Sequence, residues 1–219
     1  IQSQLPIDGM PAKRSQPPSM VFILGRSCTL PGGTHSGPVL GSVTMTAHDT
    51  LTFVPATRWD VDDVPAGLSA DLMRATRHGA FVNGAELFDN AQFSISPAET
   101  MAMDPQQRLV LEVGYAALHE SSLDRALLLG SDTGVNVGIY ANEFSTFLID
   151  GLMRRSAFTA TGSALSIASG RTSFVLGCQG PCAAFETACS AALVAYHSSS
   201  CALQRRECKM HLAIGLPNH

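Results

Sequence analysis

The carboxyl-terminal part of the chain most narrowly limits what it can fold into. A short apolar run, Ala183–Glu186, predicts a strand, and a stretch rich in small residues predicts a helix over residues 190–204 directly after it. Met210–Gly215 then predicts a further buried strand. Strands that alternate with helices over short spacings are typical of an α/β fold.

Two helix starts are marked further upstream. Ser96-Pro97-Ala98-Glu99 has the form of a capping box with proline at the first helical position. Asp104-Pro105 repeats the device and predicts a helix from about Pro105 to Glu120. The apolar spacing assigns its buried face to Leu109, Val113, Ala116 and Ala117.

The remaining elements are predicted from shorter patterns. Met20–Leu24 and Gly134–Tyr140 have the apolar character of strands, and 158–170 has helical character. Residues 34–56 predict no definite element. Residues 1–19 are rich in Gln, Ser and Pro, which is typical of an arm or linker.

Composition excludes several classes of protein. Hydrophobic residues make up 45% and charged residues 15%, which is typical of a globular protein with a substantial core. The net charge is −4, which favours neither nucleic acid nor an anionic membrane surface as a partner. No apolar run is long enough to span a bilayer, so we expect no membrane span.

The cysteines indicate a reducing environment. Six cysteines are too sparse and too unevenly spaced for a secreted disulfide framework. We therefore expect an intracellular, reducing compartment, with cytoplasm and plastid both open. Cys178 and Cys182 lack the spacing of a zinc-ligand pair, and no nucleotide-binding fingerprint is present. We expect neither a metal nor a cofactor.

Cys189 is the candidate nucleophile. It falls where the predicted strand ends and the helix begins, so the positive end of the helix dipole would favour its thiolate form. The amides of the first helical turn could donate to a developing oxyanion. A lone cysteine is more often a small buried hydrophobic residue, however, and the spacing alone leaves both interpretations open.

A family resemblance adds to this interpretation. The motifs Ser169-Gly170-Arg171 and Glu186-Thr187-Ala188-Cys189-Ser190 resemble the active-site region of β-ketoacyl synthases from modular polyketide synthases. Met103-Asp104-Pro105-Gln106-Gln107-Arg108, Arg58-Trp59-Asp60 and the 134–139 strand also match that family, in its order. The resemblance runs from about residue 20 to 215. It identifies residues 20–219 as the N-terminal ketosynthase domain, following the arm of residues 1–19.

The resemblance implies a fold and a chemistry. The fold would be α/β and thiolase-like, a layered arrangement of which this chain supplies the N-terminal half only. Cys189 would carry an acyl group as a thioester. A malonyl-type extender on an acyl carrier protein would then be decarboxylated and condensed with that group, in polyketide or fatty-acid synthesis.

Some features depart from the family. Its two catalytic histidines lie beyond the cysteine in motifs that are absent here, so we expect a domain truncated before them. His197 lies eight residues after Cys189, about 12 Å along a helix, and is too distant to be its base. Glu186 and Cys182 replace the family's usual Asp and Ser, and residues 34–49 do not match its first helix.

Two hypotheses of different classes follow. In the first, the chain is part of an active ketosynthase, and its partners are an acyl carrier protein and acyl and malonyl thioesters. In the second, it is a catalytically inactive, ketosynthase-like structural subunit of a larger assembly. A lone half of a two-halved fold would expose a large apolar surface, so we expect a homodimer or other protein subunits in either case.

Overall fold

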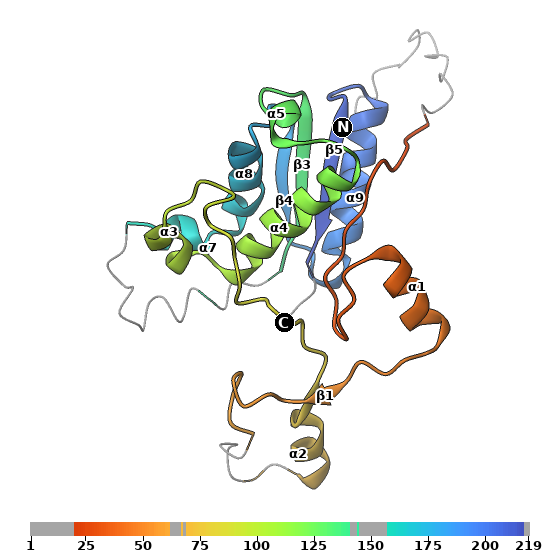
Figure 1. The fold of residues 1–219 in the computed structure, drawn as a ribbon, viewed down its shortest axis with the longest axis vertical. Coiled ribbons are helices and arrows are strands. Elements are labelled where there is room, and N and C mark those ends of the chain that lie inside the picture. The colour runs from red at the N-terminus through yellow and green to blue at the C-terminus, as the bar shows by residue number, and fades with distance from the viewer. Residues whose placement is uncertain (1–19, 62–66, 68, 141–143, 145–156, 217–219) are drawn as a thin grey trace, which may run out of the picture.

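A three-stranded parallel sheet lies at the centre of the fold (Figure 1). The computed structural model describes residues 20–61, 67, 69–140, 144 and 157–216. The order is β4 (Cys182–Phe185), β3 (Thr133–Gly138) and β5 (Met210–Gly215). Every residue of β3 is buried, as expected of a strand covered on both faces. The three predicted strands in this region are confirmed, with ends that differ by at most two residues.

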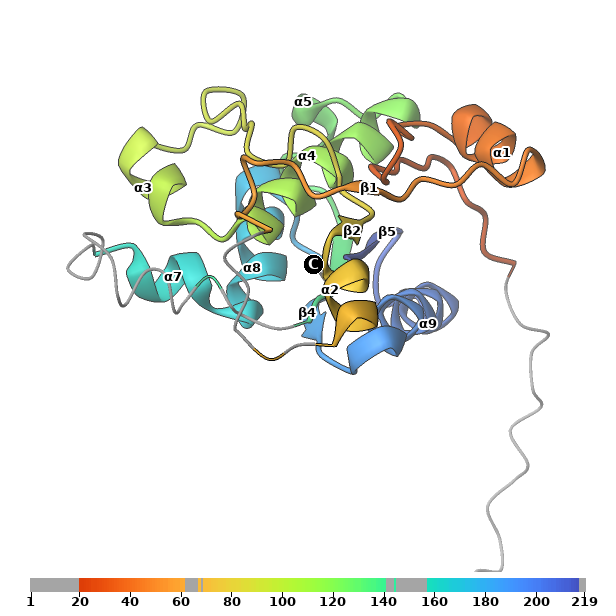
Figure 2. The ribbon, with the colours of Figure 1, turned by 90° about the horizontal axis from the view of Figure 1, so that it is seen from below.

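Helices cover both faces of this sheet. Val135 of β3 lies opposite Leu212 of β5, and both belong to the main apolar cluster beneath α4 (Pro105–Glu120) and α8 (Leu165–Leu176). The helix α9 (Ala191–Gln204) packs on the opposite face, against Gly138 and Gly215. Viewed along the strands, α4 and α9 lie on either side of the sheet (Figure 2). The layered arrangement confirms the predicted α/β class.

Helix α4 has the predicted ends but only part of the predicted buried face. Leu109 is buried, as expected, whereas Ala116 is exposed. Val113 and Ala117 are partly buried. The prediction was wrong at Ala116, because α4 packs both against the sheet and against the segment around Phe93. These two contacts also bury other residues of the helix, namely Gln107, Val110, Leu111, Gly114 and Leu118.

Side-chain caps begin the two helices of the 96–120 region. The Ser96 hydroxyl accepts the N–H of Glu99 at 3.2 Å at the start of α3 (Pro97–Ala102). The Asp104 carboxylate accepts the N–H of Gln106 at 2.8 Å at the start of α4. Both predicted helix starts are confirmed. In a full capping box the Glu99 carboxylate would accept the N–H of Ser96. Here that carboxylate forms an ion pair with Arg171.

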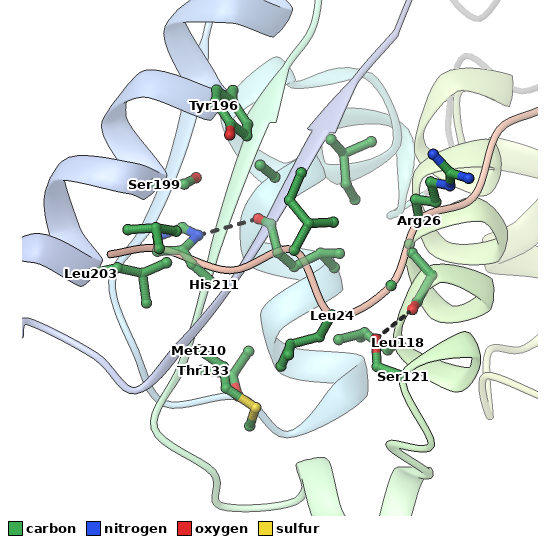
Figure 3. Close-up of a pocket in the computed structure, with 18 of the residues that line it drawn as sticks. Leu24, Arg26, Leu118, Ser121, Thr133, Tyr196, Ser199, Leu203, Met210 and His211 are labelled. Carbon is green, nitrogen blue, oxygen red and sulfur yellow. Dashed lines mark hydrogen bonds between the residues drawn. The ribbon is translucent and has the colours of Figure 1, made fainter. Parts of the chain in front are cut away.

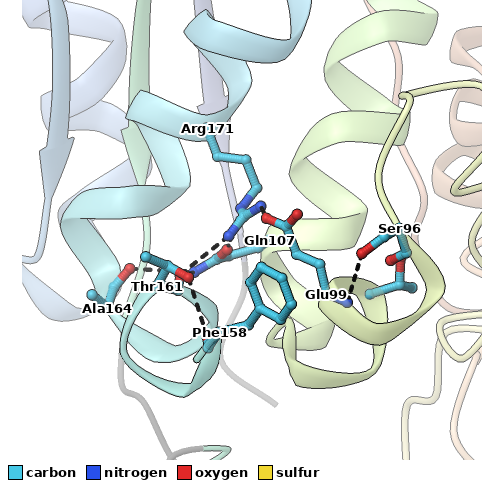
Figure 4. Close-up of polar contacts among 8 residues, drawn as sticks. Ser96, Glu99, Gln107, Phe158, Thr161, Ala164 and Arg171 are labelled. Carbon is cyan, nitrogen blue, oxygen red and sulfur yellow. Dashed lines mark hydrogen bonds and ion pairs between the residues drawn. The ribbon is translucent and has the colours of Figure 1, made fainter. Parts of the chain in front are cut away.

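Arg171 of α8 joins four helices through one guanidinium group (Figure 4). It forms an ion pair with Glu99 of α3 and donates to the Gln107 side chain of α4 at 2.9 Å. It also donates to the carbonyl of Thr161 in α7 (Thr159–Ser163), at 3.4 Å. Gln107 in turn donates to the carbonyls of Thr161 and Ala164. The Arg171 side chain is only 8% exposed, so this network is largely shielded from water.

Smaller elements lie away from the sheet. The strands β1 (Thr52–Phe53) and β2 (His78–Gly79) pair antiparallel, and α2 (Ala70–Thr76) lies between them in sequence. Helix α1 (Gly37–Met45) lies within residues 34–49, whose sequence does not match the first helix of the family. A helix is present there all the same, and none of its residues is buried. The short helix α5 (Arg125–Leu128) precedes β3.

The predicted strand at Met20–Leu24 is wrong. These residues belong to no strand, and Met20, Phe22, Ile23 and Leu24 are 68–79% exposed. The segment lines a cavity of about 560 Å³ together with β5 and pairs with no strand of the sheet (Figure 3). Its apolar character therefore indicated a segment that lines a cavity. The predicted arm, residues 1–19, lies outside the described residues.

His211 of β5 makes stability depend on pH. Burial lowers its pKa, and its buried Nε2 atom has no hydrogen-bond partner among the described residues. Because the unfolded chain binds the proton more readily, this contribution to stability is complete above the unfolded pKa of about 6.5 and declines as the pH falls below it. We expect the urea midpoint to fall between pH 8 and pH 5 and to fall less in His211→Gln. An equal decline in both proteins would contradict this assignment.

Candidate functional site

Cys189 lies in a tight turn between a strand and a helix. Strand β4 ends at Phe185, a 3₁₀ turn, η1, spans Ala188–Ser190, and α9 begins at Ala191. Ala188 adopts a φ of 51°, which is uncommon for a residue with a side chain. The Ser190 hydroxyl donates to the carbonyl of Thr187 at 2.7 Å and closes the turn. The thiol of Cys189 is exposed at the opening of the helix, which confirms the predicted position.

Two backbone amides next to the Cys189 thiol are engaged within the turn. The N–H of Ser190 donates to the carbonyl of Thr187 at 3.2 Å, and the N–H of Ala191 donates to that of Ala188. Both donors are therefore engaged within the 3₁₀ turn in this conformation. Cys189 is exposed and lies at the positive end of the α9 dipole, and donation to an oxyanion by other amides of this turn stays a prediction.

Two glycines that the sequence analysis did not single out bring the turn close to the sheet. A Cβ atom at Gly138 would lie 2.4 Å from the backbone carbonyl group of Ala191. A Cβ atom at Gly215 would lie 2.4 Å from the Cβ of Ala192. Glycine at these strand ends lets the first turn of α9 rest directly on β3 and β5. A glycine inside a strand pattern is the signal that could have revealed this close approach.

We expect Gly138→Ala to destabilise the protein and to move the Cys189 turn. The new methyl group would meet backbone atoms, which cannot rotate away, so the cost should be about 1–3 kcal/mol or more. Urea denaturation would measure the loss of stability, and the alkylation rate of Cys189 would report the displacement.

Gly170→Ala is the matched control for Gly138→Ala. Gly170 lies in α8 with nothing within 4 Å of an added Cβ, so alanine there should stabilise by roughly 0.5–1 kcal/mol. Equal stability of Gly138→Ala and the unsubstituted protein would contradict the close packing of α9 on β3.

No histidine of the described residues hydrogen-bonds to Cys189. His197 contacts Cys201, with 3.5 Å between its Nε2 atom and the sulfur. His211 lies over Gly134, at the other end of β3 from the turn. The prediction that His197 is not the base for Cys189 agrees with this contact. His219 lies outside the part of the chain that the structure describes.

The other cysteines differ from Cys189 in their surroundings. Burial raises the pKa of Cys178 and Cys208, which makes both thiols poor nucleophiles at neutral pH. Cys182 is exposed at the start of β4, and Cys28 is partly buried. The described residues contain no group of three or more His, Cys, Asp or Glu side chains that could hold a metal ion.

The cavity beside β5 is separate from the Cys189 turn. Its walls come from Met20–Ser27, α4, β5 and the part of α9 from Tyr196 onward (Figure 3). Cys189 does not line it. None of the helices in the described residues is long and apolar enough to cross a membrane.

Comparison with known proteins finds one family across nearly the whole chain. Residues 19–218 match the family described as "Beta-ketoacyl synthase, N-terminal domain". Polyketide synthase GfsA of Streptomyces halstedii is 40% identical over 198 residues, which are 89% of this chain and 3% of that protein. Pikromycin polyketide synthase component PikAII of Streptomyces venezuelae is 37% identical over 215 residues, 97% of this chain and 6% of that protein. The chain thus spans a small part of these relatives.

Solved structures agree with the sequence relatives. A ketosynthase from module 6 of the bacillaene synthase of Bacillus subtilis superposes with a TM-score of 0.76 and 28% identity, over 90% of this chain and 32% of that one. The ketosynthase domain OzmH KS7 of Streptomyces albus, from oxazolomycin synthesis, also gives a TM-score of 0.76, with 25% identity over 90% of this chain and 34% of that one.

Proposed function

This chain belongs to the β-ketoacyl synthase family and corresponds to the N-terminal domain of that family, with the thiolase-like α/β fold. On this basis we propose that the chain carries the acyl-accepting cysteine of a polyketide ketosynthase. The observation that supports this role most directly is the exposed thiol of Cys189 in the turn between β4 and α9. Its position at the opening of a helix is the arrangement that nucleophilic catalysis by cysteine uses.

The proposed reaction has two steps. In the first, the Cys189 thiol attacks the carbonyl of an acyl thioester, forms a new thioester at Cys189 and releases the carrier thiol. In the second, a malonyl-type extender on an acyl carrier protein loses CO₂, and the resulting carbanion attacks the Cys189 thioester. The product is a β-ketoacyl thioester on the carrier, and the Cys189 thiolate is released.

Partners cover this half of the fold in this proposal. The motifs that carry the family's two decarboxylation histidines are not among these 219 residues, and a homodimer or other protein subunits would cover the exposed apolar surface of this half. The exposed apolar side chains of α9 support a covering partner, since Leu193 is 73% exposed and Tyr196 51%. All six cysteines are free, which supports a reducing intracellular compartment.

Labelling with cerulenin, a cysteine-directed epoxide, tests the assignment of Cys189. Peptide mapping by mass spectrometry should place the adduct on Cys189 at least about tenfold faster than on Cys182, because Cys189 alone lies at a helix opening. Cys182→Ala is the matched control and should leave labelling of Cys189 unchanged. Equal labelling of the two exposed cysteines would overturn the assignment.

Native mass spectrometry tests the need for a partner. The proposal predicts assemblies larger than the chain's own 23.1 kDa. A soluble monomer of that mass, stable at micromolar concentration, would contradict it.

A further inference from the structure

A second cysteine of α9 has a base beside it. The sulfur of Cys201 lies 3.5 Å from the Nε2 atom of His197, one helical turn earlier. Residues at this spacing lie on the same face of a helix, so the contact follows from the helix itself. His197 is exposed and Cys201 partly so, which leaves the pair open to small reagents from solvent.

We propose that Cys201 is a second reactive thiol of this protein, which His197 activates toward soft electrophiles such as alkyl halides and thioesters. The imidazole nitrogen takes the thiol proton as the sulfur forms its bond to carbon. With an alkyl halide, the sulfur–carbon bond replaces the carbon–halogen bond, and the halide and one proton are released. With an acyl thioester, the acyl group passes to Cys201, and His197 returns the proton to the departing thiolate.

The helix dipole does not assist this pair. Helix α9 runs from Ala191 to Gln204, so Cys201 lies in its last turn and His197 near its middle, beyond the reach of the terminal partial charges. The negative end of the dipole disfavours a thiolate at Cys201, so the reactivity of this thiol rests on its contact with His197. In this respect Cys201 differs from Cys189, which lies at the opposite end of the same helix.

The other cysteines of the described residues lack such a contact. Burial raises the pKa of Cys178 and Cys208 and slows their reaction. Cys182 is exposed and Cys28 partly buried, and no imidazole hydrogen-bonds to either sulfur. The two provide internal references for a thiol without an adjacent base. Of the two residues proposed to meet a partner, Tyr196 lies about 140° around the helix from Cys201, whereas Leu193 is four residues before His197 and shares its side of the helix.

Competitive alkylation tests the proposal. The full chain is treated with a limiting amount of iodoacetamide at pH 7, and the modified cysteine peptides are quantified over time. Cys201 should react faster than Cys182 although it is less exposed, and His197→Gln should slow Cys201 at least about tenfold by removing the base. His48→Gln, a change at another exposed histidine, is the matched control and should leave every rate unchanged.

The outcomes separate this inference from the proposed function. Modification of Cys189 and of Cys201 is mapped separately within one digest, so the same experiment gives an alkylation rate for each cysteine. An unchanged rate at Cys201 in His197→Gln, or a rate below that of Cys182 in the unsubstituted protein, would overturn the inference whatever Cys189 does. An unchanged Cys189 rate in His197→Gln shows that the variant keeps its fold.

Discussion

The Cys189→Ala variant should lose the rapid phase of acylation by an octanoyl thioester of N-acetylcysteamine. Alanine has no nucleophile, so the initial rate should fall on the order of 10²-fold or more, to the rate set by the remaining thiols. Intact-mass measurement over time gives the rate, and peptide mapping locates the acyl group. Because Cys189 is exposed, the substitution removes no buried contact and should leave stability nearly unchanged.

Cys182→Ala is the matched control for this acylation experiment. It removes an exposed cysteine of β4 a few residues earlier and should keep the rapid phase. The residual acylation of Cys189→Ala should map to Cys201, in keeping with its contact with His197. A rapid phase that survives Cys189→Ala and disappears in Cys182→Ala would contradict the nucleophile assignment.

The second large effect is expected on stability, at Arg171. Arg171→Met keeps much of the side chain's volume but leaves the Glu99 carboxylate and the Gln107 side chain without their donor. Removal of one partner from a buried ion pair commonly costs 3–5 kcal/mol, and Glu99 is 25% exposed, so we expect a loss of about 2–3 kcal/mol. Urea denaturation monitored by circular dichroism measures the free energy of unfolding.

Arg205→Met provides the matched comparison. The pair that Arg205 makes with Glu207 is 3.8 Å long, and its side chains are 72% and 47% exposed. Its removal should cost about 0–1 kcal/mol, because exposed pairs gain little in water. The double variant Arg171→Met/Glu99→Met should lose less than the sum of its single changes, since neither charge is left alone. Similar losses in Arg171→Met and Arg205→Met would show that the network does not stabilise the fold.

Local patterns in the sequence were sufficient for much of the fold. The ends of α4 follow from Asp104 as a cap and from the apolar repeat after it, both of which act within one or two turns. The strand–turn–helix around Cys189 is likewise local, because a short apolar run and a stretch of small residues adjoin there. This local pattern left the role of Cys189 open, and the resemblance of the surrounding motif to the family selected it as the candidate nucleophile, whose catalytic role remains a prediction.

Only the tertiary structure decided features that depend on residues far apart in the chain. Met20–Leu24 has the composition of a strand, but a strand needs a paired neighbour, and this segment pairs with none of the described strands. The close packing of the first turn of α9 on the sheet depends on Gly138 and Gly215, which belong to β3 and β5. The network around Arg171 joins residues from four helices. Periodicity and capping describe neighbours along the chain, whereas these contacts arise only when distant segments pack together.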